Sequence, residues 1–162
     1  MKFSAPRLER VVHSLHAHAV DYVLIGGYAL AIYGGDSVTT DIDLAIDRDP
    51  QNLDRAALAI RDLNPTLANG APMPMDRFSF AGEFTRFYTD AGEIDVLRRL
   101  NNVDGFAGLR SRAVCFDLFG VTVPVASLPD LRAMKVDVPR PKDMIHVLEI
   151  DALIEELENE SG

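Results

Sequence analysis

The sequence predicts an α/β (α+β) fold, in which a central mixed β-sheet is flanked by helices and followed by C-terminal helices. Three observations predict it: short strand-like segments, amphipathic segments before and after them, and a length of 162 residues. With 48% hydrophobic and 25% charged residues, a chain of this length can bury a core without a disulfide or structural metal. We therefore predict one domain over residues 1–162.

The first part of the chain predicts helix, strand, helix and strand in that order. Residues 22–25 are an uninterrupted apolar run typical of a buried strand, and residues 29–33 predict a short helix that ends at two glycines. Residues 41–47 alternate with period two and give the clearest strand pattern. The first helix is predicted to begin after Pro6, with one apolar face formed by Leu8, Val11, Val12, Leu15 and Ala19.

The later elements are predicted from the same patterns and from the turn residues between them. A helix over 53–63 is followed by a loop over 67–75 that is rich in Pro, Ala and Gly. The aliphatic residues of the last predicted helix, at 141–158, are expected to pack on the core. Strands are predicted at 77–80, 85–88, 93–97, 114–119 and 121–125, and helices at 128–135 and 141–158.

Three acidic side chains stand out on the predicted strands. Asp41 and Asp43 lie two residues apart, so both leave the same face of their strand, and Asp95 points away from the core on another strand. Taken alone, the Asp41–Asp43 pair also fits a solvated strand face. If the two strands are neighbours, the three carboxylates converge into a set of oxygen ligands that suits Mg²⁺ and two-metal displacement at phosphorus.

Two glycines, Gly26 and Gly27, separate a predicted buried strand from a predicted short helix. Backbone amides at such a position can bind a phosphate. A tight strand-to-helix turn also needs glycine, with or without a ligand. The spacing fits neither a P-loop nor a dinucleotide-binding fingerprint. These residues alone leave both interpretations open.

In combination, these segments resemble the signature of the nucleotidyltransferase superfamily, which is related in fold to polymerase beta. The chain most resembles the small bacterial branch of this superfamily, which includes minimal nucleotidyltransferases and abortive-infection-type toxin enzymes. The order of the elements carries the resemblance: Gly26-Gly27-Tyr28-Ala29-Leu30, Tyr33-Gly34, Thr39-Thr40-Asp41-Ile42-Asp43-Leu44, Glu93-Ile94-Asp95-Val96-Leu97, Leu131-Arg132-Ala133-Met134-Lys135 and Arg140-Pro141-Lys142-Asp143.

The resemblance implies that an NMP is transferred from an NTP to an acceptor hydroxyl. Asp41, Asp43 and Asp95 would be the catalytic residues and the ligands of two Mg²⁺ ions, or of Mn²⁺, and Asp95 would help to deprotonate the acceptor. The catalytic core would cover residues 22–125 and a helical C-terminal part residues 127–159. The nucleotide, ATP or another NTP, would be bound by Gly26, Gly27, Ser37, Thr39, Lys135, Arg140 and Lys142.

Ser37 departs from the family, which often has an arginine at this position. Lys135, Arg140 or Lys142 would have to replace that cation, whereas Asp143 is expected to cap its helix or pair with Lys135 or Arg140. A catalytically weak nucleotide-binding or partner-binding protein with the same fold is therefore the alternative. The presence of all three carboxylates opposes it, because like charges held together without a metal cost stability.

The acceptor and any partner are less defined by the sequence than the nucleotide. The chain has 16 Lys and Arg against 25 Asp and Glu, a net charge of −9, which weighs against extended nucleic-acid binding, and we expect no DNA partner. The resemblance implies an acceptor tRNA or protein, within a toxin–antitoxin pair in some members. On charge grounds, a protein or small-molecule acceptor is level with tRNA.

The sequence also predicts where the protein works. It has a single cysteine, Cys115, which cannot form a disulfide within the chain. Neither a signal-peptide pattern nor an apolar run of about 20 residues is evident. We therefore expect a cytoplasmic protein without a membrane partner.

Overall fold

The computed structural model describes residues 5–36, 39–136 and 140–161. Ser37, predicted to bind the nucleotide, lies outside the described residues. The helices are α1 (Ala5–Ala17), α2 (Gly26–Ile32), α3 (Pro50–Arg61), α4 (Phe106–Arg112), α5 (Leu128–Lys135) and α6 (Pro141–Ser161), with a 3₁₀ helix η1 (Arg77–Phe80). The strands are β1 (Tyr22–Ile25), β2 (Asp41–Ile46), β3 (Phe84–Thr89), β4 (Gly92–Leu97), β5 (Val114–Leu118) and β6 (Val121–Val125).

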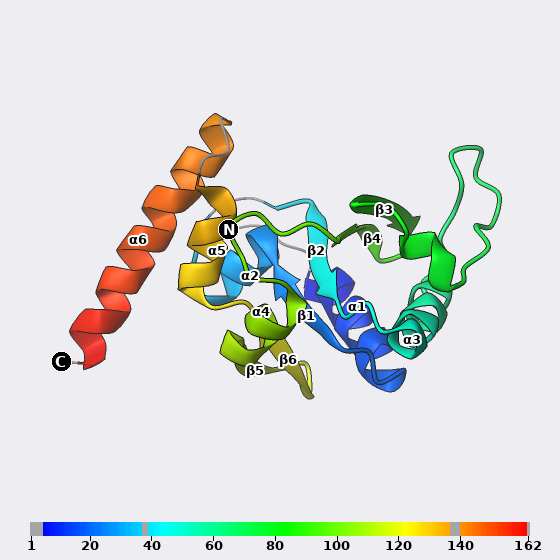
Figure 1. Cartoon of the computed structure of the whole chain (residues 1–162), viewed down its shortest axis with the longest axis horizontal. Coiled ribbons are helices and arrows are strands. Elements are labelled where there is room, and N and C mark those ends of the chain that lie inside the picture. Colours follow the sequence, from blue (N-terminus) through cyan, green and yellow to red (C-terminus); the bar gives the residue numbers. More distant parts are fainter. Residues whose placement is uncertain (1–4, 37–38, 137–139, 162) are drawn as a thin grey trace.

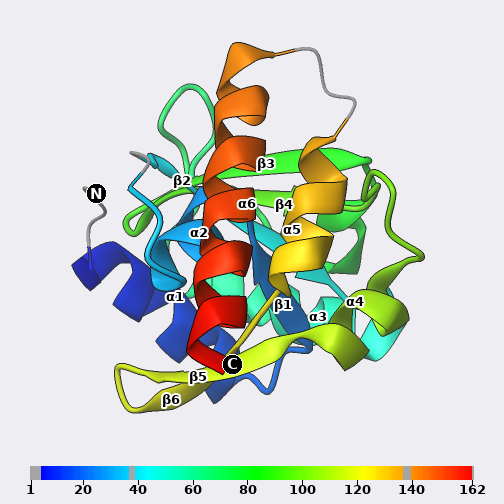
Figure 2. The same cartoon turned by 90° about the vertical axis from the view of Figure 1, so that its left-hand side faces the viewer.

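The six strands form one mixed sheet in the order β3-β4-β2-β1-β6-β5, which confirms the predicted fold class. Strand β2 pairs with β4 and β1 with β6 in parallel, and the remaining neighbours are antiparallel. Helices α1 and α3 lie on one side of the sheet, and α5 and α6 run side by side on the other (Figures 1 and 2). The strand predicted at 41–47 is observed as β2, which is central and has β4 as a direct neighbour.

The apolar patterns of the first elements are confirmed with one exception. Every residue of β1 is buried, and the α1 face is buried through Leu8, Val11, Val12 and Leu15. Ala19, which was expected on the same face, lies beyond the helix end and is exposed. Its φ of 53° shows that the chain has already left the helical conformation there.

Two helices begin earlier than predicted, and a third was not predicted. Helix α2 includes the glycine pair in its first turn, directly after β1. Helix α3 begins at Pro50 rather than Leu53, because Asp49 accepts a hydrogen bond from the backbone N–H of Asn52 and proline suits the first turn. Helix α4 is short and buries a single residue, Leu109, so its sequence carries little periodic signal.

The predicted strand at residues 77–80 is wrong, because this segment is the 3₁₀ helix η1. The Asp76 side chain accepts from the N–H of Phe78, and the Ser79 hydroxyl accepts from the N–H of Asp76. These local bonds stabilise a tight turn. Phe78 and Phe80 alternate with polar residues as in a strand, but they do not share a face, because Phe80 is buried whereas Phe78 is exposed.

Helix α6 packs less of its surface than predicted. Ile150 is buried, and Leu153 and Ile154 are partly buried against the core. Ile145 and Leu148, however, are 60% and 71% exposed, because they lie on the face of the helix opposite the buried residues Asp143, His146 and Ile150. None of the described helices is both long and apolar enough to cross a bilayer.

Candidate active site

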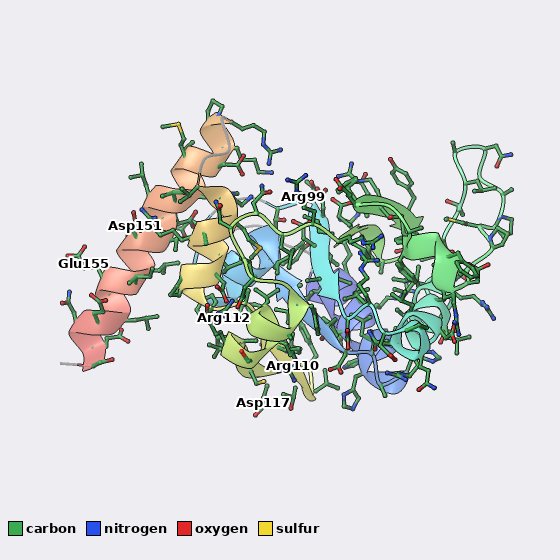
Figure 3. The ribbon with its side chains drawn as sticks, in the orientation of Figure 1. Arg99, Arg110, Arg112, Asp117, Asp151 and Glu155 are labelled. Carbon is green, nitrogen blue, oxygen red and sulfur yellow. The ribbon has the colours of Figure 1, made fainter. Side chains whose placement is uncertain are left out.

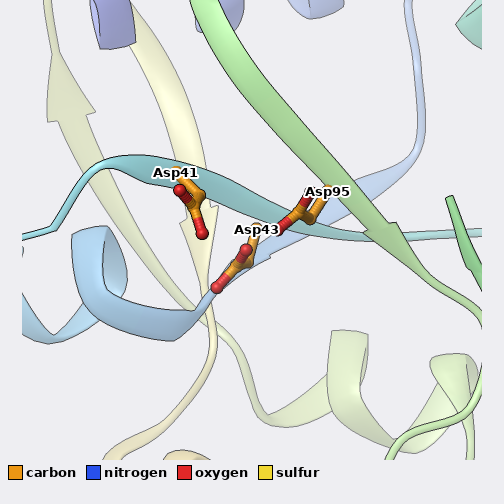
Figure 4. A group of neighbouring side chains, drawn as sticks. All are labelled: Asp41, Asp43 and Asp95. Atoms are coloured by element: carbon orange, nitrogen blue, oxygen red, sulfur yellow. The ribbon is translucent and has the colours of Figure 1, made fainter. Parts of the chain in front are cut away.

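Strands β2 and β4 bring three carboxylates together. Ile42 and Leu44 are buried on one face of β2, which leaves Asp41 and Asp43 on the other. The parallel register aligns Asp43 with Asp95 of β4. One oxygen from each of the three residues lies within 4.8 Å of the other two, and Figure 4 shows the side chains gathered together. We call Asp41, Asp43 and Asp95 the acidic triad.

The acidic triad is electrostatically strained. Burial raises the pKa of Asp43 to about 7, with further contributions from the neighbouring charges of Asp95 and Asp41. The charge of Lys135 acts in the opposite direction, so this residue of α5 faces the same region. Asp95, which was predicted to point away from the core, is only 3% exposed. The triad therefore has more negative charge than its surroundings balance.

Arg86 of β3 is a residue of the site that the sequence analysis missed. Its Nε and Nη2 donate to the two oxygens of Asp95 at 2.7 and 2.9 Å, and Nη2 also donates to Asp41 Oδ2 at 3.2 Å. Nη1 lies 3.6 Å from Glu93 Oε2. No local sequence pattern marks Arg86, because its place opposite Asp95 depends on the antiparallel register of β3 with β4.

Gly26, Gly27 and Thr39 pack directly beside the acidic triad. A Cβ on Gly26 would lie 2.1 Å from Asp43 Oδ2, and the φ of +73° at Gly26 disfavours any side chain. A Cβ on Gly27 would lie 2.8 Å from Thr39 Oγ1, which itself donates to the backbone carbonyl of Asp41. The glycine pair is therefore required by close approach to these side chains, and it lies partly buried beside Asp43 and Thr39.

A second ionic cluster joins α5 to α6. Lys135 Nζ lies 2.9 Å from Asp143 Oδ1, and Arg140 Nε lies 2.6 Å from Asp143 Oδ2. Burial would raise the pKa of Asp143, but the hydrogen bonds from Lys135 and Arg140 outweigh it and hold the pKa below its usual value. We call Lys135, Arg140 and Asp143 the Asp143 cluster, and it confirms the expected ion pair of Asp143.

The two remaining features near this cluster are Lys142 and His146. The Lys142 side chain is exposed. His146 is buried and its Nδ1 has no hydrogen-bond partner among the described residues. Burial lowers the pKa of His146, and the charges of Lys135 and Lys142 lower it further. The structure thus groups Lys142 with the Asp143 cluster rather than with the acidic triad.

The donor set of the acidic triad fits a hard divalent cation. Mg²⁺ and Mn²⁺ prefer carboxylate oxygens, and the three carboxylates come from rigid neighbouring strands. The pKa of Asp43 is raised because its negative charge is buried without an adequate counter-charge. A bound cation would supply that counter-charge.

Comparison with known proteins supports the resemblance in fold. No family model and no curated protein matches the sequence. Among solved structures, the lincosamide antibiotic adenylyltransferase LnuA with bound lincomycin superposes with a TM-score of 0.63 at 12% identity, covering 94% of this chain and 99% of that chain.

Two further solved structures are similar. The antibiotic-resistance factor ANT(2'')-Ia has a TM-score of 0.56 at 14% identity, over 94% of this chain and 83% of that chain. An antigenic nucleotidyltransferase-like protein from Paracoccidioides brasiliensis has a TM-score of 0.56 at 18% identity, over 92% of this chain and 75% of that chain. These similarities show that the chain shares its fold with the three proteins.

Proposed function

We propose that the chain is a nucleotidyltransferase that depends on Mg²⁺ or Mn²⁺ and transfers an NMP from an NTP to an acceptor hydroxyl. The observation that carries the proposal is the convergence of Asp41, Asp43 and Asp95 beside a glycine pair that has no room for side chains. The fold similarity to LnuA and ANT(2'')-Ia supports the same reaction class.

In this proposal, the acidic triad is the catalytic and metal-binding group. Bound divalent cations would neutralise phosphate charge and favour in-line displacement at the α-phosphorus. Asp95 would accept the proton of the acceptor hydroxyl, whose oxygen forms the new bond to the α-phosphorus while the bond to the pyrophosphate breaks. Asp41 and Asp43 would anchor the metal-binding site on the central strand. The reaction would then be driven by positioning and charge rather than by a nucleophilic side chain of the protein.

The nucleotide is proposed to lie between the glycine pair and the Asp143 cluster. Gly26 and Gly27 would donate backbone N–H groups to the β- and γ-phosphates, and Thr39 would flank them. Lys135 would be the main cation for the triphosphate, because its charge already reaches Asp43. Arg140 and Lys142 would assist it. Residues 22–125 would then be the catalytic core, with cations supplied from 127–159.

We propose a small hydroxyl-bearing molecule as the acceptor, with protein and tRNA as alternatives. LnuA, which has a similar fold, is a lincosamide antibiotic adenylyltransferase with bound lincomycin. Exposed acidic side chains such as Asp117 and Glu155 add to a surface that opposes polyanions (Figure 3). Several surface arginines are also neutralised in ion pairs: Arg77 with Asp54, Arg112 with Asp104 and Arg132 with Asp151.

The decisive experiment is transfer of label from α-³²P-labelled NTPs in the presence of Mg²⁺ or Mn²⁺. Three acceptor pools would be compared: a panel of hydroxyl-bearing antibiotics and metabolites, total tRNA, and cell protein. Asp43→Asn is the inactive control. Labelling of one pool by the wild type, lost in Asp43→Asn, supports the proposal and identifies the acceptor class.

Two other outcomes would point elsewhere. NTP binding by calorimetry without transfer to any pool would support the nucleotide-binding alternative. Equal labelling by wild type and Asp43→Asn would contradict the assigned site. A cognate toxin or antitoxin stays a prediction from the resemblance, and co-purification with the product of a neighbouring gene tests it.

A further inference from the structure

The Arg86 guanidinium contacts more carboxylates than an arginine in an ordinary surface ion pair does. Its guanidinium donates to both oxygens of Asp95 and to Asp41, and it faces Glu93. We propose that Arg86 is a built-in counter-ion, which holds the acidic triad together without metal and competes with the divalent cation for it. This inference rests on the proposed function in taking the triad as the cation site.

The strand geometry fixes the guanidinium in this place. Arg86 lies in the middle of β3, directly across from Asp95 in the antiparallel register. The ring of Phe84, on the same face of β3, lies 5.7 Å from Arg86 Cζ and adds a cation–π contact. The bidentate fork is the geometry in which arginine binds a carboxylate most strongly. Arg86 is thus anchored rather than loosely associated with the site.

Arg86 does not compensate the negative charges of the three triad carboxylates equally. Asp95 and Asp41 bind Arg86 directly, whereas the positive charge that acts on Asp43 is that of Lys135. One guanidinium therefore faces Asp41, Glu93 and Asp95, and Asp43 stays the carboxylate with the largest need for a cation. A metal that binds at Asp43 would reach a triad whose other two members are already occupied.

Competition follows from the contacts of Asp95 and Asp41. Both oxygens of Asp95 and one oxygen of Asp41 already accept hydrogen bonds from Arg86. A divalent cation among these oxygens would meet the positive guanidinium at close range, and the two would repel each other. Loss of the arginine charge removes this opposition, but it also leaves the metal-free carboxylates to repel one another.

The test compares Mn²⁺ binding and thermal stability in the full chain, using calorimetry and EPR for binding. Arg86→Gln removes the charge and keeps a hydrogen-bond donor, and we expect it to bind Mn²⁺ about tenfold more tightly than the wild type. Without metal it should melt at a lower temperature, and Mn²⁺ should restore the loss. Arg86→Lys keeps the charge, so its Mn²⁺ affinity should stay near that of the wild type.

Arg77→Gln is the matched control. Arg77 forms a similar bidentate pair with Asp54, at 2.9 and 2.7 Å, and its side chain is 41% exposed against 35% for Arg86. It lies outside the acidic triad, so its loss should leave Mn²⁺ affinity unchanged. A general effect of removing an arginine would appear equally in both variants.

The outcomes separate this inference from the proposed function. Equal or weaker Mn²⁺ binding by Arg86→Gln, with binding retained in the wild type, overturns the competing role alone. Weaker binding would mean that Arg86 arranges the ligands instead. Absence of Mn²⁺ binding in the wild type and in Arg86→Gln contradicts the cation site itself, and therefore both proposals.

Discussion

The acidic triad and the Asp143 cluster are opposite solutions to the burial of a carboxylate. In the Asp143 cluster, Lys135 and Arg140 both bind one buried carboxylate. In the acidic triad, Arg86 binds Asp41 and Asp95, whereas the cation that acts on Asp43 is the more distant Lys135. Burial pushes both Asp43 and Asp143 toward protonation, yet the pKa of Asp43 is raised to about 7 and that of Asp143 is lowered. The number of cations within contact decides the direction.

This difference suggests complementary ligands for the two regions. The triad has surplus negative charge and is suited to divalent cations, whereas the Asp143 cluster has surplus positive charge and is suited to phosphates. Lys135 links them, since it contacts Asp143 and its charge also acts on Asp43. A metal-bound triphosphate carries both kinds of charge, which is why the pairing of these regions supports the proposed substrate.

The largest effect is expected from Asp43→Asn, which removes a charge from the triad. Transfer activity should fall by about a thousandfold or more if Asp43 is the metal ligand that we propose. The metal-free protein should become about 1–2 kcal/mol more stable at pH 8, because a buried, repelled carboxylate is removed. Labelled-NTP assays and urea unfolding measure the two effects.

The sign of that stability change follows from the direction of the pKa shift. A carboxyl group whose pKa rises on folding binds its proton more tightly in the native state. Wild-type stability without metal should therefore decrease as the pH rises from about 4 to 7, and Asp43→Asn should lack this decrease. Asp54→Asn, in a surface ion pair outside the site, is the control and should keep full activity.

Gly26→Ala is expected to have the second largest effect, with about a hundredfold loss of activity. The added Cβ would overlap Asp43 Oδ2 and displace it from the triad. Gly120→Ala is the matched control, because Gly120 also has a positive φ, +80°, but open space around the Cβ position. Both variants should lose about 1 kcal/mol of stability from backbone strain. Equal activity in the two would show that the close approach at Gly26 is irrelevant.

The pH dependence of metal binding should be smaller, about tenfold between pH 6 and pH 8. Asp43 must lose its proton to bind a cation, and its pKa of about 7 places that step within this interval. Mn²⁺ affinity should therefore rise with pH, in the opposite direction to metal-free stability. Calorimetry at the two pH values measures it, and Asp43→Asn should bind weakly at both.

The smallest effect is expected from Lys135→Met, which should weaken NTP binding by about fivefold. Asp143 keeps Arg140 as its partner in this variant, so the fold should persist. Lys142→Met removes an exposed cation of the same type and should change NTP affinity less than twofold. If Lys142→Met has the larger effect, the phosphates bind nearer the start of α6 than proposed.

The sequence was sufficient to predict the triad but not its counter-ion. Period-two alternation placed Asp41 and Asp43 on one strand face, and their convergence with Asp95 required only that β2 and β4 be neighbours. Arg86 carries no such local signal, because its role depends on the register between β3 and β4. A register is set by the packing of the whole sheet.

The errors in the fold have a different origin. The predicted strand at 77–80 failed because Asp76 and Ser79 form local hydrogen bonds that favour a 3₁₀ turn over extended backbone. Helix α4 was missed because a helix that buries only Leu109 has almost no apolar periodicity. Short elements that are stabilised by single side chains are therefore the least predictable parts of this chain.

The parallel pairing of β2 with β4 has a consequence for synthesis on the ribosome. Helix α3, η1 and β3 all come between these two strands in the chain, so Asp95 reaches Asp43 only after they have been translated. Such non-local strand pairing is slow to form. A nascent chain that ends before β4 therefore carries Asp41 and Asp43 without their third partner, and the acidic triad is complete only once β4 pairs with β2.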